Sequence, residues 1–329
     1  MSMVEQYTST GSKLWHHPEA MDAYREGLPY TVISTHISPE GRCNLKCKYC
    51  SVWKRNQLHR LPLETIKDYV RALRINGLKA VILTGGGEPT LYPDFNELME
   101  WLAHMGIEVG LITNGTRTYL VHPDVWGMFA WVRVSLNVFS GWMGGITLPR
   151  GVSSSCTVGC SFIWSEDMHD SVFSDVSWMA TKLGAEYVRF LPDCTLPPDE
   201  LAEAHTILEE KLKKLADPRF FHQWKVHRTP KAEVCHQSFF RPYLCETGIV
   251  YPCDSVVLNG TPGQFEEKFA LCEAKRIISF LNHRADGPCP REDCPGCVFA
   301  DTVDMLDDWK AGTLEPQKEV DDHIHPNFV

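Results

Sequence analysis

Short β-rich runs alternate with amphipathic helical periods from about residue 30 to residue 215, and this alternation restricts the fold more than any other feature. Buried strands are predicted at six apolar runs: TVISTHI (31–37), AVILTG (80–85), GIEVGLITN (106–114), WVRVSLNV (131–138), CTVGCSFIW (156–164) and EYVRFLP (186–192). Amphipathic helices are expected between them, such as one with Ile66, Tyr69 and Leu73 on a single face. These repeats predict an α/β fold, a partial (β/α)6 barrel that falls short of a closed eight-stranded one.

The character of the sequence changes after about residue 217, where the helical periodicity stops. Seven of the 13 cysteines fall between Cys235 and Cys297, and RPYLCETGIVYPCDSVVLNG (241–260) is typical of a β-hairpin with Gly248 in its turn. A chain of 329 residues has room for one large domain and a small appendage. We therefore expect an N-terminal extension (1–30), a core domain (31–217), a cysteine-rich hairpin and loop domain (218–310) and a polar tail (311–329).

The charge of the chain and its N-terminus bear on partners and location. The net charge of −10 argues against a nucleic-acid substrate and against binding to an anionic membrane surface. No apolar run is long enough for a transmembrane helix, and the N-terminus does not resemble a signal peptide. We expect a cytoplasmic protein whose reduced cysteines are metal ligands or reactive thiols rather than disulfides.

Three cysteines gather in the stretch GRCNLKCKYCSVW (41–53), which follows the first predicted strand. Cys43, Cys47 and Cys50 have the spacing C-x3-C-x2-C, with Tyr49 directly before the last thiol. Reacting groups in such sheets lie at the carboxyl ends of the strands, which is where this loop falls. A zinc knuckle needs a fourth ligand, and His59 stands beyond the usual short spacings. Chance clustering in a cysteine-rich chain is the other alternative.

This spacing, with an aromatic residue before the last cysteine, resembles the signature of the radical S-adenosylmethionine (SAM) superfamily. In that family three cysteines hold a [4Fe-4S] cluster, and its fourth iron chelates the amino and carboxylate groups of SAM. Electron transfer then splits SAM, and a 5′-deoxyadenosyl radical abstracts hydrogen from the substrate. The resemblance implies a radical SAM barrel, a cluster on the three cysteines, bound SAM, and an external one-electron reductant of the flavodoxin or ferredoxin type.

A second part of the resemblance lies at the ends of the later strands. LTGGGEPTLYPD (83–94) follows the second strand, where the family carries a glycine-rich motif that receives the SAM amino group, although GGGEP alone could be an ordinary turn. ITNG (112–115) and RVSLN (133–137) stand where the family contacts the SAM ribose and carboxylate, and the aromatic residue of the cysteine loop would sit near the adenine. The implied cofactor-binding residues are Tyr49, Gly85, Gly86, Gly87, Glu88, Asn114, Ser135, Asn137 and Arg189.

The C-terminal cysteines resemble the SPASM or shorter twitch extension, which binds auxiliary iron–sulfur clusters in many radical SAM enzymes. The ligand set implied for one auxiliary [4Fe-4S] cluster is Cys235, Cys253, Cys294 and Cys297, with Cys289 as a rival for either of the last two. The chain departs from the full SPASM pattern because only one C-x2-C pair follows the hairpin. One auxiliary cluster is therefore better supported than two. A zinc ribbon made by the same cysteines is the alternative.

Some family members quench the substrate radical with a cysteine hydrogen donor. Cys160 and Cys245 could face the cavity and serve in this role, although a buried structural thiol is the simpler interpretation of each. Scattered cysteines such as Cys156 and Cys194 are interpreted as small buried side chains. Arg189, at the end of the sixth strand, could grip a carboxylate or phosphate, or pair with a surface acid.

The substrate class is the least constrained inference. Peptide-modifying relatives often begin with a winged-helix segment that grips a leader peptide, and the first strand here starts too early to leave room for one. We expect epimerisation, dehydrogenation or decarboxylation of a small intermediate such as a sugar, nucleoside or aminoglycoside-like compound. The alternatives are modification of a ribosomally made peptide and a non-catalytic zinc or iron–sulfur protein.

Overall fold

One large sheet organises the chain. The computed structural model describes residues 2–52, 56–136, 145–225, 229–255, 268–283, 297–317, 320 and 322–329. Its strands within these residues are β1 (Ser34–Ile37), β2 (Ala80–Leu83), β3 (Glu108–Thr113), β4 (Phe129–Ser135), β5 (Thr157–Trp164), β6 (Tyr187–Pro192), β7 (Phe220–His222), β8 (Tyr243–Leu244), β9 (Ile249–Tyr251) and β10 (Cys272–Glu273). They pair in the order β10-β9-β8-β1-β2-β3-β4-β5-β6-β7, parallel from β8 through β1 to β7 and antiparallel at β9 and β10.

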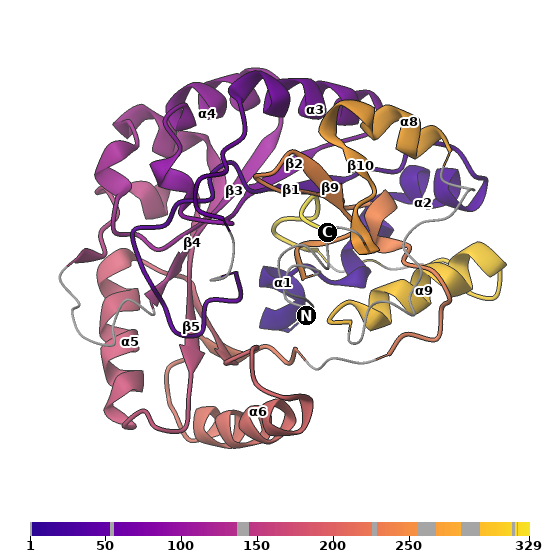
Figure 1. Cartoon of the computed structure of the whole chain (residues 1–329). Helices are drawn as coiled ribbons and strands as arrows, with labels where there is room; N and C mark the ends of the chain where they lie inside the picture. The colour runs from indigo at the N-terminus through magenta and orange to yellow at the C-terminus, as the bar shows by residue number, and fades with distance from the viewer. Residues whose placement is uncertain are drawn as a thin grey trace.

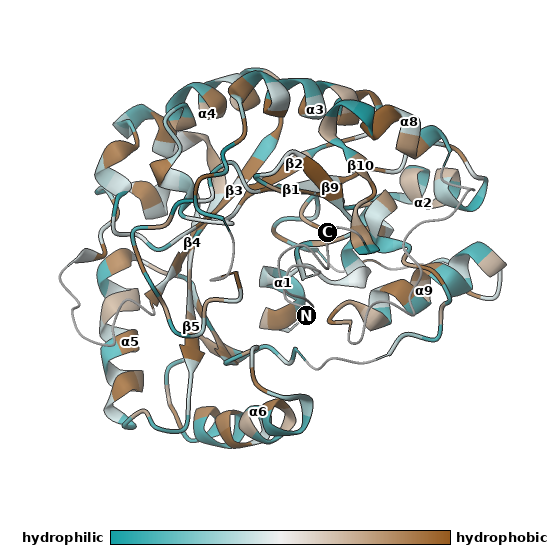
Figure 2. Cartoon of the chain, in the orientation of Figure 1, coloured by the Kyte–Doolittle hydropathy of each residue, from teal (hydrophilic) through white to brown (hydrophobic). Residues whose placement is uncertain are grey.

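Several helices follow the outside of this curved sheet, whereas α1 (Met3–Tyr7) lies inside its arc (Figure 1). Within the described residues the α-helices are α1 (Met3–Tyr7), α2 (Pro18–Arg25), α3 (Leu63–Ile75), α4 (Phe95–His104), α5 (Ser171–Leu183), α6 (Pro198–Lys213), α8 (Ile277–Asn282) and α9 (Ala300–Ala311). In Figure 2 the strands are largely brown and the outer helices mix brown with teal, as expected for helices with one buried face. No helix among the described residues combines the length and apolar character needed to cross a bilayer.

All six predicted strands are present, and the parallel α/β architecture is confirmed. The predicted apolar face of α3 is buried, with Ile66, Tyr69 and Leu73 each at most 1% exposed. The connection from β3 to β4 differs from the expected β-α alternation, because it runs through two 3₁₀ turns, Thr118–Leu120 and Pro123–Met128. The strand β7 was not predicted.

The predicted hairpin is confirmed as β8 and β9, with Gly248 at φ +84° in its turn, a conformation that favours glycine. It does not stand apart from the core sheet. Tyr243 and Leu244 of β8 pair in parallel with His36 and Ile37 of β1. The C-terminal cysteine-rich segment is therefore anchored beside the strand that leads into the cysteine loop.

The two ends of the chain meet inside the arc of strands, at the amino ends of the strands (Figure 1). Tyr7 of α1 stacks on Tyr187 at the start of β6, with ring centroids 4.2 Å apart. Phe328 packs edge-on against Trp131 of β4 at 5.4 Å. Residues 311–329 were expected to form a polar tail, but Phe328 and Val329 are each 3% exposed because they fill this end of the sheet.

Candidate active site

A buried carboxylate fastens the cysteine loop where it leaves β1. Glu40 is 1% exposed, and its side chain accepts hydrogen bonds from Arg60 Nε at 2.8 Å and Arg42 Nη2 at 3.1 Å. A second oxygen of Glu40 accepts the Arg42 backbone N–H at 3.0 Å. Removing one partner from such a buried ion pair is costly, so Glu40 fixes both ends of the loop. Sequence reasoning missed this residue.

The three predicted ligands, Cys43, Cys47 and Cys50, are all half-buried in this loop. The Cys50 N–H donates to the Cys47 carbonyl at 3.2 Å and makes a turn between the last two thiols. Burial, followed by a hydrogen bond with Cys47, raises the pKa of Tyr49, and Asp193 after β6 adds to this effect. Tyr49 thus faces the thiols. Among the described residues, no three His, Cys, Asp or Glu side chains stand close enough to hold one metal ion. Three thiols from one loop are nevertheless a donor set suited to an iron–sulfur cluster.

The glycine-rich loop after β2 packs backbone to backbone against the cysteine loop. The Gly87 N–H donates to the Glu40 carbonyl at 2.7 Å, and the Glu88 N–H donates to the Arg42 carbonyl at 2.8 Å. A Cβ on Gly87 would stand 1.9 Å from the Arg42 carbonyl oxygen, and one on Gly85 would stand 1.6 Å from the Gly87 carbonyl oxygen. No side chain fits there, so the approach of the two loops requires glycine.

The carboxylate of Glu88 is buried and hydrogen-bonded inside the fold. It is 2% exposed and accepts hydrogen bonds from the Asn114 N–H at 2.8 Å and the Thr90 N–H at 3.1 Å, and also from the Thr113 hydroxyl. Burial raises the pKa of Glu88, although these hydrogen bonds act against it. The Asn114 amide in turn lies 3.9 Å from the Cys43 sulfur. Glu88 therefore orients the end of β3 toward the cysteine loop.

The predicted residues of the later strands lie side by side on the inner face of the sheet. Ser135 of β4 is in register with Ser161 of β5, and Ser161 with Arg189 of β6. The two serine hydroxyls are 3.5 Å apart, and Arg189 Nη1 donates to Gln223 Oε1 at 2.9 Å. Among the described residues, Arg189 therefore pairs with Gln223 rather than with a surface acid. Asn137 lies outside the described residues.

The two candidate hydrogen donors lie in different places. Cys160 does not reach the inner face: it neighbours Ser161, so its side chain points to the opposite face, where it is 0% exposed in the core under the helices. Cys245 stands in the β8–β9 turn, and its thiol donates to Glu246 Oε2 at 3.2 Å. Burial raises the pKa of both thiols to about 12, so both remain protonated.

The described C-terminal cysteines are near one another. Cys235 and Cys253 pack on the same small apolar cluster around the hairpin. Burial raises the pKa of Cys253, and the neighbouring Cys235 and Cys297 contribute to the shift. Cys289 and Cys294 lie outside the described residues, so the remainder of the predicted auxiliary set stays a prediction.

Polar residues that sequence reasoning did not single out line the space between the strands and the hairpin. Asp254 Oδ2 lies 3.3 Å from His36 Nδ1, and its Oδ1 lies 3.9 Å from Arg241 Nη2. Burial raises the pKa of Asp254, but His36 and Arg241 outweigh it and hold this pKa far below its usual range. The position of Asp254 directly after Cys253 was the available signal.

Cys194 was expected to be a small buried side chain, and its burial in the structure differs from this expectation. Burial raises the pKa of Cys194, with a smaller contribution from Cys50, while Lys225 acts in the opposite direction. The thiol is half-buried rather than packed in the core.

Comparisons with known proteins agree with this site. Residues 37–141 match the family described as the Radical SAM superfamily. An S-adenosylmethionine-dependent nucleotide dehydratase of Selenomonas ruminantium is 29% identical over 108 residues, covering 32% of this chain and 38% of that protein. A GTP 3′,8-cyclase of Pelotomaculum thermopropionicum is 37% identical over 100 residues, 29% of each chain. The chain thus matches about a third of the length of these curated relatives.

Among solved structures, Streptococcus suis SuiB has a similar fold, with a TM-score of 0.52, 14% identity, and coverage of 79% of this chain and 70% of that chain. At this identity the likeness concerns the fold alone. The matched residues 37–141 contain both the cysteine loop and the glycine-rich loop. This segment is therefore similar to the radical SAM superfamily, and the similarity implies a [4Fe-4S] cluster and SAM.

Proposed function

We propose that this chain reductively cleaves SAM and abstracts hydrogen from a small biosynthetic intermediate. The observation that carries the proposal is the meeting of three loops at the carboxyl ends of β1, β2 and β3. Asn114 contacts the cysteine loop at Cys43, and the Gly87 N–H bonds to the backbone of the same loop. Three thiols, a glycine-rich backbone and an ordered amide at one sheet edge suit a cluster with SAM beside it.

The residues would divide the work as follows. Cys43, Cys47 and Cys50 would hold the cluster, which when bound supplies the one-electron reduction that turns SAM into a hydrogen-abstracting radical. The backbone of Gly85 to Gly87 would accept the SAM amino group, because glycine has no side chain of its own to keep a ligand away from its carbonyl group. The Ser135 hydroxyl would hydrogen-bond the nucleoside part. The C-terminal hairpin, seated beside β1, would help to exclude water from the reacting groups.

We extend the proposal to the C-terminal cysteines and to the hydrogen donor. Cys235, Cys253 and Cys297 would ligate an auxiliary [4Fe-4S] cluster together with Cys289 or Cys294. Cys245 is favoured over Cys160 as a donor because its thiol stands beside Glu246 in the hairpin turn rather than in the core. An external flavodoxin- or ferredoxin-type reductant in the cytoplasm would supply electrons.

A small-molecule substrate is favoured by the curated relatives, whose names are a nucleotide dehydratase and GTP cyclases. Within that class we propose a sugar, nucleoside or related intermediate that is epimerised, dehydrogenated or decarboxylated. The inner face of the sheet supports this, because Ser135, Ser161 and Arg189 give it a hydrogen-bonding lining.

The test is anaerobic purification followed by reconstitution, metal analysis and incubation with SAM and dithionite. We expect about eight irons per chain for two four-iron clusters, and release of 5′-deoxyadenosine. A chain with full iron that forms no 5′-deoxyadenosine would contradict the proposed activity. Zinc in place of iron would indicate a structural metal protein, and about four irons would remove the auxiliary cluster. Hydrogen–deuterium transfer from candidate peptides rather than small molecules would redirect the substrate class.

A further inference from the structure

Basic side chains from distant parts of the chain converge inside the arc of strands. Arg133 lies on β4, Arg189 on β6, Lys225 shortly after β7 and Arg241 shortly before β8. The chain as a whole carries a net charge of −10, so composition does not account for this convergence. We propose that these side chains bind the phosphate group of a small substrate, an inference that rests on the radical SAM function proposed above.

Strand register places two of these side chains on one face of the sheet. Arg133 of β4 is in register with Gly159 of β5, and Gly159 with Tyr187 of β6, two residues before Arg189. The pKa values of the group agree with this arrangement. Burial, followed by the charge on Arg133, lowers the pKa of Arg189 to about 9. Burial, followed by the charge on Arg189, lowers the pKa of Lys225 to about 8. Each cation therefore lies within the field of the next. Arg189 and Lys225 both stay protonated at neutral pH, so a ligand that enters meets positive charge.

Carboxylates balance only part of this charge. Asp254 lies 3.9 Å from Arg241, and no acidic side chain among the described residues forms an ion pair with Arg133, Arg189 or Lys225. The Nε atoms of Arg133 and Arg189 are buried and have no hydrogen-bond partner in the described part of the chain. Buried donors without partners are rare in native proteins, and a bound ion or ligand is one way in which they are satisfied.

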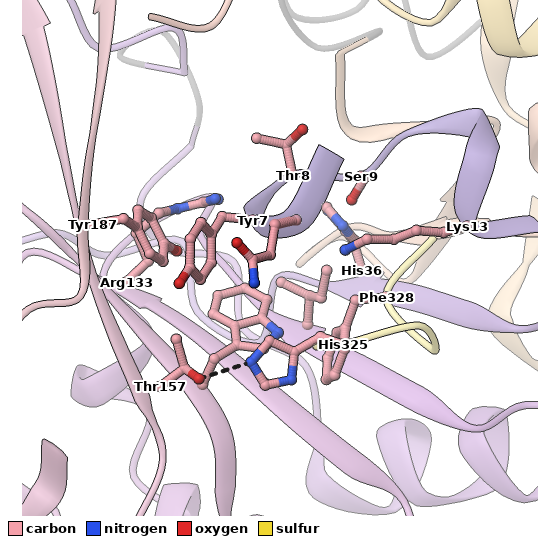
Figure 3. Close-up of a pocket in the computed structure, with 13 residues that line it drawn as sticks. Tyr7, Thr8, Ser9, Lys13, His36, Arg133, Thr157, Tyr187, His325 and Phe328 are labelled. Atoms are coloured by element: carbon pink, nitrogen blue, oxygen red, sulfur yellow. Dashed lines mark hydrogen bonds between the residues drawn. The ribbon is translucent and has the colours of Figure 1, made fainter. Parts of the chain in front are cut away.

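The N-terminal segment adds a further basic side chain near Arg133. Lys13 is 2% exposed, and burial, followed by the charge on Arg133, lowers its pKa to about 8. Figure 3 shows Lys13, His36 and Arg133 around one pocket, with His325 held by Thr157 beneath them. None of the described residues that line this pocket is acidic. Lys13 therefore adds positive charge beside Arg133 at this pocket.

The chemistry of these basic side chains favours a phosphate over a carboxylate as their ligand. A phosphate group carries a charge of about −1.5 to −2 and three acceptor oxygens, whereas a carboxylate carries one charge and two oxygens. Arg133 and Arg189 each offer a planar fork of donors that matches a phosphate edge, and Lys225 adds a compact charge. Three cations without carboxylate partners suit a phosphate better than a single carboxylate.

A competing role for these cations is to balance negative charge near the cysteine loop, since Lys225 lowers the pKa of Cys194 and Cys50 of that loop raises it. The two roles predict different consequences. A charge-balancing cation would change the iron content or the reduction potential of the clusters when it is replaced. A phosphate-binding cation would change anion affinity while iron remains bound.

The experiment uses the reconstituted full-length chain and isothermal titration calorimetry with inorganic phosphate, pyrophosphate and malonate. We expect pyrophosphate to bind more tightly than malonate, and Arg133→Gln and Arg189→Gln to weaken pyrophosphate binding about tenfold or more. Arg189→Lys keeps the charge without the fork and should lose part of the affinity. Arg74→Gln, on the exposed side of α3, removes the same charge elsewhere and should bind as wild type does. Iron content and thermal unfolding are measured on every variant.

Four results would overturn the phosphate site: no binding of phosphate or pyrophosphate, equal binding of malonate, variants that bind pyrophosphate like wild type, or loss of iron together with affinity. If Arg133→Gln fails to fold, the two Arg189 variants still decide between these results. The proposed activity fails separately. Pyrophosphate binding without 5′-deoxyadenosine formation supports the anion site and rejects the radical function, while 5′-deoxyadenosine formation without any anion binding rejects only the anion site.

Discussion

Glu246, in the turn of the C-terminal hairpin, lies directly against Gly86 of the glycine-rich loop. A Cβ added to Gly86 would stand 2.4 Å from Glu246 Oε2, and Glu246 is 6% exposed. Gly41, at the start of the cysteine loop, also faces this side chain, since its Cβ would stand 3.4 Å from the Glu246 Cγ. The hairpin thus touches both loops that would hold the cofactors. A change in the C-terminal segment can therefore alter the proposed SAM site.

Replacement of Gly86 by Ala should test this contact. The added methyl group overlaps the buried Glu246 carboxylate, so we expect a loss of stability of about 1–3 kcal/mol and weaker SAM binding. Glu246→Ala in the same chain removes the obstacle and should restore part of both losses. The measurements are denaturant unfolding and equilibrium dialysis with labelled SAM.

Two controls accompany this pair. Gly87→Ala meets the Arg42 carbonyl oxygen at 1.9 Å, a backbone atom, so Glu246→Ala should not rescue it. Gly127 has no atom within 4 Å of an added Cβ, so Gly127→Ala should behave as wild type does. Additive effects of Gly86→Ala and Glu246→Ala would show that the two residues do not interact in solution.

The cysteine loop predicts a selective loss of iron. Cys47→Ala removes one of the three thiolates, and we expect a loss of about four irons per chain with the visible absorbance of the cluster reduced accordingly. Cys156→Ala serves as the matched control, because Cys156 packs against the core and burial raises the pKa of its thiol to about 11. Equal iron in the two variants would argue against a cluster in this loop.

Anion affinity should depend on the protonation of Lys225. Burial and Arg189 lower its pKa to about 8, with Arg133 in the same direction and Asp254 and Cys194 in the opposite one. Lys225 is charged below this pKa, so pyrophosphate binding should weaken by about tenfold between pH 7 and pH 9. Lys225→Arg should bind pyrophosphate with a flatter pH profile. Both proteins are measured by calorimetry, and the titration of pyrophosphate itself affects them equally. If wild type and Lys225→Arg show the same dependence of affinity on pH, Lys225 does not contact the anion.

The meeting of the chain ends predicts a dependence of stability on the last residues. Phe328 is 3% exposed against Trp131, so Phe328→Ala should lower the free energy of unfolding by about 3–5 kcal/mol. Ile324 is 43% exposed, and Ile324→Ala should change it by less than about 0.5 kcal/mol. Chemical denaturation of both variants compares them directly. Equal stabilities would mean that the C-terminal residues are not docked in solution.

Several elements could be read from local sequence because they depend on local patterns. The apolar runs around β5 and β6 specified buried strands, and the period of Ile66, Tyr69 and Leu73 specified the inner face of α3. Gly248 indicated the hairpin turn through its preference for positive φ. The cysteine spacing and the glycine-rich loop indicated the proposed cofactor edge for the same reason, since each lies within a few residues of a strand end.

Alternation along a strand was also present in the sequence but was not used. It places Cys160 on the side opposite Ser161, and Arg133 on the same side as Trp131 and Ser135. Applied in advance, it would have removed Cys160 as a hydrogen donor and indicated Arg133 as a lining residue. The role of Glu88 could not be read in this way, because its partners Thr113 and Asn114 belong to the next strand.

By itself, then, the sequence determined the order of strands and helices, the position of the thiol loop and the need for glycine beside it, because propensity, periodicity and steric freedom act over a few residues. Only the tertiary structure decided that Glu246 lies on Gly86, that Phe328 packs against Trp131, and that Arg133 and Arg189 share the inner face of the sheet. These relationships join segments far apart in the chain, and they exist only once burial of the shared core has drawn those segments together.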